Sequence, residues 1–236
     1  MIDSGQPSDE KRPVRAQDLG ELQVLANEHW SLLATRSLTY SEALSRVSMF
    51  LSVLSGAVIA LALVAQADHF GQTFVLVAIL ILSVVVFVGA TTVMRLEVLN
   101  HDDLRWVQGM NRIRHGYLDL HPEAEPYFVT APHDDFRGIS LTLGFESTPT
   151  NGLGQIAHGV QTLPGMVSVL VAVVAGALLA MIAHAFSAPT ALVVVAAIAG
   201  FIATEGLFGA WGVRSFMRLR SGRKSRFPTE ETAKQQ

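Results

Sequence analysis

Glu205 is the residue whose type and placement point most directly to chemistry. It is the one Asp, Glu, Lys or Arg within four long apolar stretches of a 236-residue chain. These stretches cover residues 47–67, 73–94, 164–186 and 191–212. An ionised carboxylate in such surroundings is costly unless it is protonated, hydrogen-bonded or bound to a cation. Glu205 is therefore a candidate proton or cation site. The alternative is a structural carboxyl that bonds a serine, such as Ser52 or Ser168, on a neighbouring helix.

Histidine and acidic residues gather in the middle of the sequence. The tripeptide His-Asp-Asp occurs at residues 101–103 and again at residues 133–135. Such side chains could bind a divalent cation, but no HExxH or comparable ligand spacing is present. We therefore expect helix caps, turns and solvated surface here, with no metal, no cofactor and no enzymatic activity. A membrane-tethered enzyme that uses these residues is a third hypothesis for the function.

The composition excludes several classes of protein. The chain has no cysteine, which rules out disulfides, thiolate metal sites and iron–sulfur clusters. The net charge of −3 gives no reason to expect nucleic acid as a partner. Each apolar stretch reaches the ~20 residues that a helix needs to cross a bilayer core of ~30 Å. Because a backbone in lipid must satisfy its own hydrogen bonds, we predict an all-α protein with four transmembrane helices arranged as two hairpins.

The distribution of basic residues predicts the orientation of the hairpins. All 17 Lys and Arg residues lie in residues 1–46, 95–163 and 213–236, and none lies in the two short loops at residues 68–72 and 187–190. Positive charge is retained on the cytoplasmic side of membrane proteins. Both termini and the middle segment are therefore predicted to be cytoplasmic, and the two loops to lie on the opposite side.

Five cytoplasmic segments are expected besides the transmembrane hairpins at residues 47–94 and 164–212. They are a disordered tail (1–16), a helical segment (17–46), an amphipathic helix (95–121), a linker (122–163) and a basic tail (213–236), which is expected to be mobile from Gly222 onward. A second helix start is expected at Thr39, which stands three residues before Glu42 as in a capping box. The linker is expected to hold one short strand at residues 139–143.

The amphipathic helix at residues 95–121 continues the second span beyond the membrane. Its apolar residues recur at spacings of three, four or seven, interrupted by Asp103. They form a stripe of Leu99, Trp106, Met110, Ile113 and Tyr117. The polar face of the helix is mixed in sign, which favours packing of the stripe on protein over packing on the membrane surface. The candidates are the helical segment 17–46 and another subunit.

Small residues follow one face of two predicted spans at intervals of four. The first stripe is Ser48, Ser52, Gly56 and Ala60, and the second is Ser168, Ala172, Gly176 and Ala180. Such stripes let helix backbones approach closely, either within one protomer, which we favour, or between subunits. Basic residues after the last span are candidates for contact with anionic lipid headgroups. They are Arg214, Arg218, Arg220, Arg223, Lys224 and Arg226.

Three segments carry a family resemblance. Residues 28–36 read EHWSLLATR, residues 109–114 read GMNRIR and residues 125–128 read EPYF. In these segments the chain resembles a family of four-span membrane proteins from actinobacteria, over about residues 20–210. The resemblance implies a multi-pass protein of the bacterial inner (plasma) membrane, and it implies no mechanism. The hairpin with flanking cytoplasmic helices is also similar in architecture to SLATT-type two-span effector domains.

Two functions of different classes are expected from these features. The first is a non-enzymatic oligomeric scaffold, sensor or pore-forming module in the lipid bilayer, in which copies of the chain associate and a cytoplasmic protein partner can bind. The second is a small proton- or cation-coupled transporter or channel in which Glu205 titrates.

Overall fold

The computed structural model describes residues 16–144, 162–222 and 224–233 of the protein. In these ranges the chain forms helices and no strand, which confirms the all-α class. The helices are α1 (Ala16–Asp68), α2 (Gln72–Leu120), the 3-10 helix η1 (Pro122–Tyr127), α3 (Phe136–Thr142), α5 (Leu163–Ala185), α6 (Thr190–Gly222) and α7 (Glu230–Ala233). The tail expected to be disordered, residues 1–16, lies outside the described residues except for Ala16, which begins α1.

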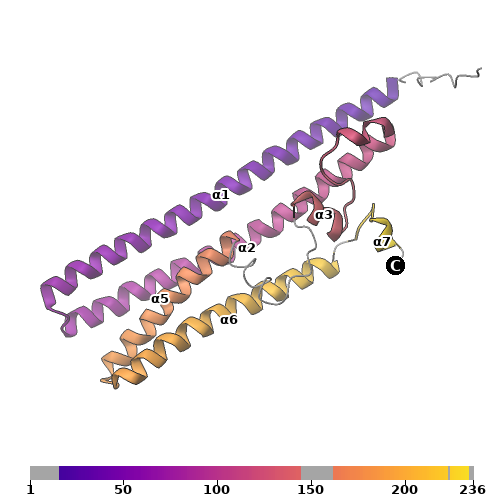
Figure 1. Ribbon diagram of the computed structural model, residues 1–236. Coiled ribbons are helices and arrows are strands. Elements are labelled where there is room, and N and C mark those ends of the chain that lie inside the picture. The colour runs from indigo at the N-terminus through magenta and orange to yellow at the C-terminus, as the bar shows by residue number, and fades with distance from the viewer. Residues whose placement is uncertain (1–15, 145–161, 223, 234–236) are drawn as a thin grey trace, which may run out of the picture.

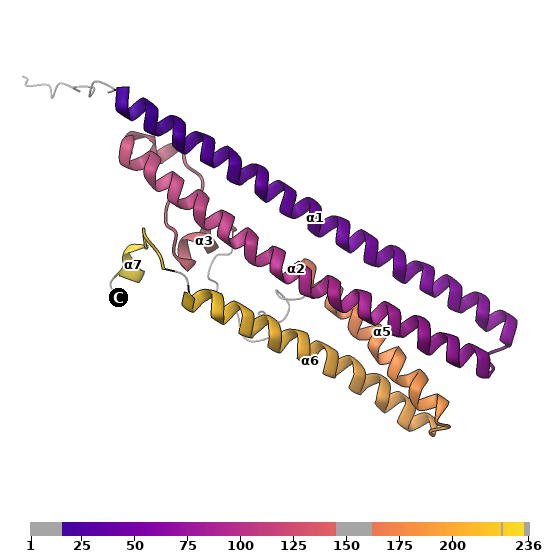
Figure 2. The ribbon, with the colours of Figure 1, turned by 180° about the vertical axis from the view of Figure 1, so that it is seen from behind.

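Four helices, α1, α2, α5 and α6, are long and apolar enough to cross a membrane. They form two hairpins, α1–α2 and α5–α6, and the loops of both hairpins lie at the same end of the molecule (Figures 1 and 2). The first residues of α1 and the C-terminal helix α7 lie toward the other end. The two loops are also the segments without Lys or Arg. Four candidate spans in two hairpins of like direction suggest a multi-pass membrane protein.

Helices α1 and α2 are much longer than a bilayer is thick. They have 53 and 49 residues, so at 1.5 Å per residue they extend about 80 and 74 Å, against a hydrocarbon core of ~30 Å. The predicted continuation of the second span is confirmed, because α2 runs without interruption to Leu120. The helix start expected at Thr39 is wrong. Thr39 lies inside α1, where its Oγ1 donates to the carbonyl oxygen of Thr35 at 3.0 Å instead of capping a new helix.

Asp68 closes the turn between α1 and α2. Its carboxylate accepts a hydrogen bond from the backbone N–H of Phe74 at 2.7 Å, and its carbonyl oxygen accepts one from Gly71 at 2.9 Å. Between them, His69 and Phe70 adopt positive φ angles of 48° and 61°. A Cβ atom at Gly71 would lie 2.8 Å from the Asp68 carboxylate. The turn is therefore tight, and the aspartate satisfies backbone donors that the start of α2 leaves free.

Helices α1, α2 and α5 share one core, and α6 packs mainly on α5. Phe50 of α1 is fully buried, and a Cβ atom at Gly89 of α2 would meet both the Phe50 ring, at 2.8 Å, and Val171 of α5. On the other side of α5, a Cβ atom at Gly176 would lie 2.7 Å from the carbonyl oxygen of Ala197 in α6. Glycines thus allow close approach at both helix contacts.

A short helix, α3, occupies the position where a strand was expected at residues 139–143, so that expectation is wrong. The Asp135 carboxylate caps α3 by accepting the backbone N–H of Gly138 at 2.9 Å. Alternation along a strand would have placed Ile139 and Leu141 on one face. Instead Ile139 is buried and Leu141 is 48% exposed, as the period of a helix requires.

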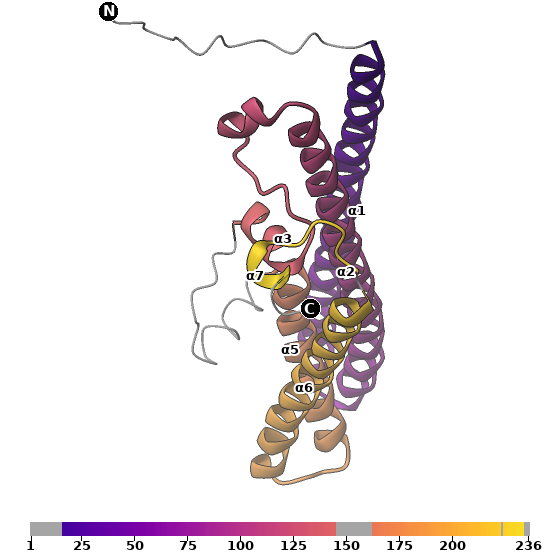
Figure 3. The same cartoon turned by 90° about the vertical axis from the view of Figure 1, so that its right-hand side faces the viewer.

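The helices η1, α3 and α7 gather beside the part of α2 that extends beyond the predicted span (Figure 3). Residues 122–144 of the predicted linker thus contain two short helices, η1 and α3, and residues 145–161 lie outside the described residues. Together with the first half of α1, these helices form a second layer that continues the membrane hairpins away from the loop end.

Candidate functional site

Glu205 faces α5 from its position on α6. Its Oε2 accepts a long hydrogen bond of 3.5 Å from the hydroxyl of Ser168, and its Oε1 is buried without a hydrogen-bond partner in the described part of the chain. Ser168 is therefore the predicted serine partner that the fold brings to Glu205. Ser52 is exposed on α1, where its hydroxyl donates to the carbonyl oxygen of Ser48. At the contact of α5 and α6, one oxygen of the Glu205 carboxyl thus has a hydrogen bond and the other, within the described chain, has none.

The two small-residue stripes lie in different surroundings. In the α5 stripe, Ser168, Ala172 and Gly176 are buried and Ala180 is partly buried, at the contacts with α2 and α6. In the α1 stripe, Ser48, Ser52 and Gly56 are exposed and Ala60 is partly exposed. A Cβ atom at Gly56 would meet no atom within 4 Å. The α5 stripe therefore packs inside the protomer, whereas the α1 stripe faces outward.

The apolar stripe of α2 lies against α1. Leu99, Met110 and Ile113 are buried, and Trp106 and Tyr117 are partly buried. Leucines of α1 fill the places beside the glycines of α2: a Cβ atom at Gly109 would lie 2.9 Å from Leu32, and one at Gly116 would lie 3.2 Å from Leu25. The two long helices therefore stay paired well beyond the predicted membrane boundary.

Asp103, which interrupts this stripe in the sequence, has a partner on α1. It is 9% exposed, and its two oxygens accept hydrogen bonds from Arg36 Nε at 2.6 Å and Nη2 at 3.2 Å. Such a two-point contact between a guanidinium and a carboxylate is strong and sets the register of the two helices. Sequence reasoning missed the pair because the two residues stand 67 positions apart.

The opposite face of α1 carries large apolar side chains that nothing in the described chain covers. Trp30 and Leu38 are each 71% exposed, Val24 is 68% exposed and Leu19 is 58% exposed. All four lie in residues 17–46, which the charge pattern places outside the membrane. Isolated apolar residues are common on protein surfaces, but a row of them along one helix is a candidate interaction surface.

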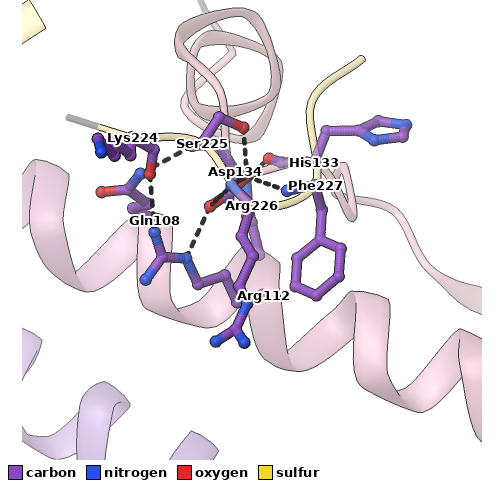
Figure 4. Close-up of polar contacts among 9 residues, drawn as sticks. Gln108, Arg112, His133, Asp134, Lys224, Ser225, Arg226 and Phe227 are labelled. Carbon is purple, nitrogen blue, oxygen red and sulfur yellow. Dashed lines mark hydrogen bonds and ion pairs between the residues drawn. The ribbon is translucent and has the colours of Figure 1, made fainter. Parts of the chain in front are cut away.

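The second His-Asp-Asp tripeptide forms the centre of a polar cluster with the C-terminal segment (Figure 4). Asp134 is fully buried. Its oxygens accept from Arg112 Nε at 2.6 Å, from the Ser225 hydroxyl at 2.6 Å, and from the backbone N–H groups of Arg226 and Phe227 at 3.0 and 2.7 Å. Burial alone would raise the pKa of Asp134, but these hydrogen bonds outweigh it and lower the pKa to about 2. The carboxylate thus stays ionised and fastens three segments together.

Asp135 holds the same segment one residue further on. Its Oδ2 accepts from the hydroxyls of Thr229 and Thr232, both at 2.7 Å, and from the backbone N–H of Thr229 at 3.2 Å. The rings of His115 and Phe227 stack beside this contact with centroids 4.0 Å apart. The expectation of a mobile tail is therefore wrong for residues 224–233, which dock on α2 and α3.

The basic residues proposed to meet lipid headgroups divide into three groups. Arg214 and Arg218 are exposed on α6 close to the predicted membrane boundary. Lys224 and Arg226 have exposed side chains but lie in the docked segment, where the carbonyl oxygen of Lys224 accepts from Arg112 Nη2 at 3.2 Å. Arg223 and the side chain of Arg220 lie outside the described residues.

The described residues show no metal site. Among them, no group of three or more His, Asp or Glu side chains is placed to hold a metal ion. A cavity of about 210 Å³ lies among α1, α2 and the start of α5, lined by residues such as Tyr40, Leu99 and Pro164. Glu205 does not line this cavity, so the cavity offers that carboxyl no route to either side of the protein.

Comparison of the chain with protein-family models, with curated proteins and with solved structures finds no match. The resemblance to the actinobacterial family stays a prediction, and function has to be argued from geometry.

Proposed function

We propose that the protein is a non-enzymatic membrane assembly module whose copies associate along α1. The row of exposed apolar side chains on the part of α1 outside the predicted spans is the observation that carries this proposal. Lipid cannot cover that row if residues 17–46 lie in water. Each such side chain contributes about 1.5–3 kcal/mol when it becomes fully buried.

A second copy of this chain is the partner that fits the whole face of α1. The exposed Ser48, Ser52 and Gly56 within the predicted span permit close helix packing in lipid, and the exposed Trp30 and Leu38 continue the outward face in water. A partner must therefore offer one helix that crosses the membrane and extends far beyond it in the same direction. Copies in one membrane share their orientation, so their α1 helices run parallel with equal residues at equal depth.

Single cysteines test this interface directly, because the natural chain has none. A Ser52→Cys variant should give a disulfide-linked dimer on mild oxidation in membranes. The matched control is Thr91→Cys, which places a cysteine at similar predicted depth on an exposed position of α2. Adding Trp30→Glu and Leu38→Glu to Ser52→Cys should lower the cross-linked fraction. Equal cross-linking of both single variants would indicate random collision and would contradict the proposal.

We further propose that the loop end faces away from the cytoplasm in a bacterial inner membrane, with both termini cytoplasmic. The support is the absence of Lys and Arg from both loops, together with their position at one end of the molecule. Arg214 and Arg218 would then lie near anionic lipid headgroups. Reporters inserted at residues 70 and 188 should show activity outside the cytoplasm, and cytoplasmic activity at either site would reverse the topology.

A proton- or cation-coupled transporter is the second candidate, and the buried, unpartnered Oε1 of Glu205 favours it. A carboxyl oxygen without a donor in a predicted span can take up a proton or a cation. In this case Glu205→Gln should abolish pH- or cation-driven flux into liposomes, whereas Glu123→Gln, an exposed carboxyl outside the spans, should not. Equal flux in both variants would leave Glu205 as a packing residue that bonds Ser168.

A further inference from the structure

Arg114 on α2 is a buried cation without a counter-ion. It is 9% exposed, and its Nη1 donates a hydrogen bond to the Asn111 side-chain oxygen at 2.7 Å. No carboxylate in the described part of the chain forms an ion pair with it. A guanidinium carries five N–H donors and stays protonated in proteins. A buried charge is costly unless an opposite charge compensates it.

Two buried carboxylates of this layer are already paired with other arginines. Asp103 is engaged through both oxygens by Arg36. Asp134 is engaged by Arg112 and by the docked C-terminal segment. Asp135, the third buried carboxylate, is held by the hydroxyls of Thr229 and Thr232. None of the three forms an ion pair with Arg114 in the described part of the chain.

Asn111, the hydrogen-bond partner of Arg114, is polar and uncharged. Asn111 is fully buried and fixed in place, since its amide donates to the His133 carbonyl oxygen at 2.7 Å and its oxygen also accepts from Thr142 at 3.0 Å. Burial and the nearby Arg114 both lower the pKa of His29 on α1. The Asn111 amide therefore orients the Arg114 guanidinium, and the electrostatic potential on the α1 side of Arg114 is positive.

The free donors of Arg114 remain within reach of solvent. Fully buried nitrogen or oxygen atoms without a hydrogen bond occur, within the described part of the chain, in the side chains of Trp106, His133 and Glu205. The side chain of Arg114 contains no such atom. Its unbonded nitrogen atoms thus keep some solvent contact. Arg114 also stands 20 residues after Met94, the predicted end of the second span, which places it about 30 Å along α2 from the membrane. A lipid headgroup does not reach that distance.

We propose that Arg114, oriented by Asn111 and assisted by His29, binds a small soluble oxyanion between α1 and α2. The class comprises phosphate, sulfate and small solutes that carry such a group or a carboxylate. A planar guanidinium matches two oxygens of an oxyanion, which distinguishes these ligands from chloride. The site does not depend on association of copies along α1, since every residue named belongs to one protomer.

Thermal unfolding of the full chain in detergent tests this site, with potassium phosphate or sulfate compared with potassium chloride at equal ionic strength. At ten times the dissociation constant, the oxyanion should raise the Tm by about 3–6 °C. Arg114→Met should lose the shift, and in chloride it should be at least as stable as the natural protein because the unmatched charge is gone. Arg105→Met, which removes an exposed arginine of the same helix, should keep the shift.

A second measurement tests for the bound oxyanion in the natural protein, without a substitution. Titration of His29 by NMR should show its pKa rising when phosphate replaces chloride, because a bound anion stabilises the imidazolium. Equal Tm shifts in the natural protein and in Arg114→Met would overturn the proposal. An unchanged His29 titration would do the same, as would a shift that chloride produces equally well.

Discussion

Removal of the Asp134 carboxylate should release the C-terminal segment from α2 and α3. The carboxylate is fully buried and joins α2, the start of α3 and residues 225–227 through hydrogen bonds of 2.6–3.0 Å. In Asp134→Ala, the Arg112 guanidinium and two backbone N–H groups lose their acceptor at once. The remaining Asp135 contacts hold the segment from one side.

The size of the effect follows from the electrostatics of this carboxylate. Its pKa falls from 3.8 to about 2 in the folded protein, which corresponds to about 2 kcal/mol. Breaking a buried ion pair by removing one partner costs more, about 3–5 kcal/mol, because the other charge is left uncompensated. Because the folded-state pKa is lowered, this stability is present above about pH 4 and is lost as the pH falls through 2.

Hydrogen–deuterium exchange of the Arg226 and Phe227 amides is the direct assay. A loss of at least 2 kcal/mol should lower their protection by about 30-fold or more in Asp134→Ala. The natural protein should show a similar loss when it is brought from pH 5 to pH 2, after correction for intrinsic exchange. Asp102→Ala, which removes a carboxylate with a longer, 3.4 Å contact to Arg105, is the control. Unchanged protection in Asp134→Ala would refute the reasoning.

Two further substitutions probe the helix contacts. Asp103→Asn leaves Arg36 without its counter-charge and should lower the stability of the α1–α2 pair by about 2–3 kcal/mol. The loss should be seen as a lower Tm in detergent. An unchanged Tm would mean that solvent screens the Arg36–Asp103 ion pair. Gly89→Ala should cost about 1–3 kcal/mol because the added methyl meets Phe50. Gly209→Ala, where a Cβ meets no atom within 4 Å, should change stability by less than about 0.5 kcal/mol, and equal effects of the two glycine variants would contradict the packing argument.

The membrane helices were predictable because their signals are local. Charge-free stretches of about 20 residues specify spans, and loops without Lys or Arg specify which ends lie together. The periodicity of Leu99, Met110 and Ile113 likewise predicted the continuation of α2, where those side chains are buried. At Thr39 the local signal failed, because continuous packing of α1 on α2 outweighs one capping sequence.

The polar contacts were not predictable because they join residues far apart in the chain. Asp134 and Ser225 are separated by 91 positions, and no pattern around either residue indicates the other. The sequence showed Asp103 as a break in an apolar stripe, which is a sign of a buried partner, but it did not identify Arg36. Glu205 stood out as a lone charge, and its relation to Ser168 depended on the crossing of α5 and α6.

The unbroken helix α2 joins the second predicted span rigidly to the far end of the protein. Leu120 stands 26 residues beyond Met94, a length of about 39 Å. A change in tilt of about 5° inside the bilayer, of the kind that a difference in lipid thickness produces, would move that tip sideways by about 3 Å. Small changes in bilayer thickness would thus displace η1, which lies far from any lipid, by distances of the order of ångströms.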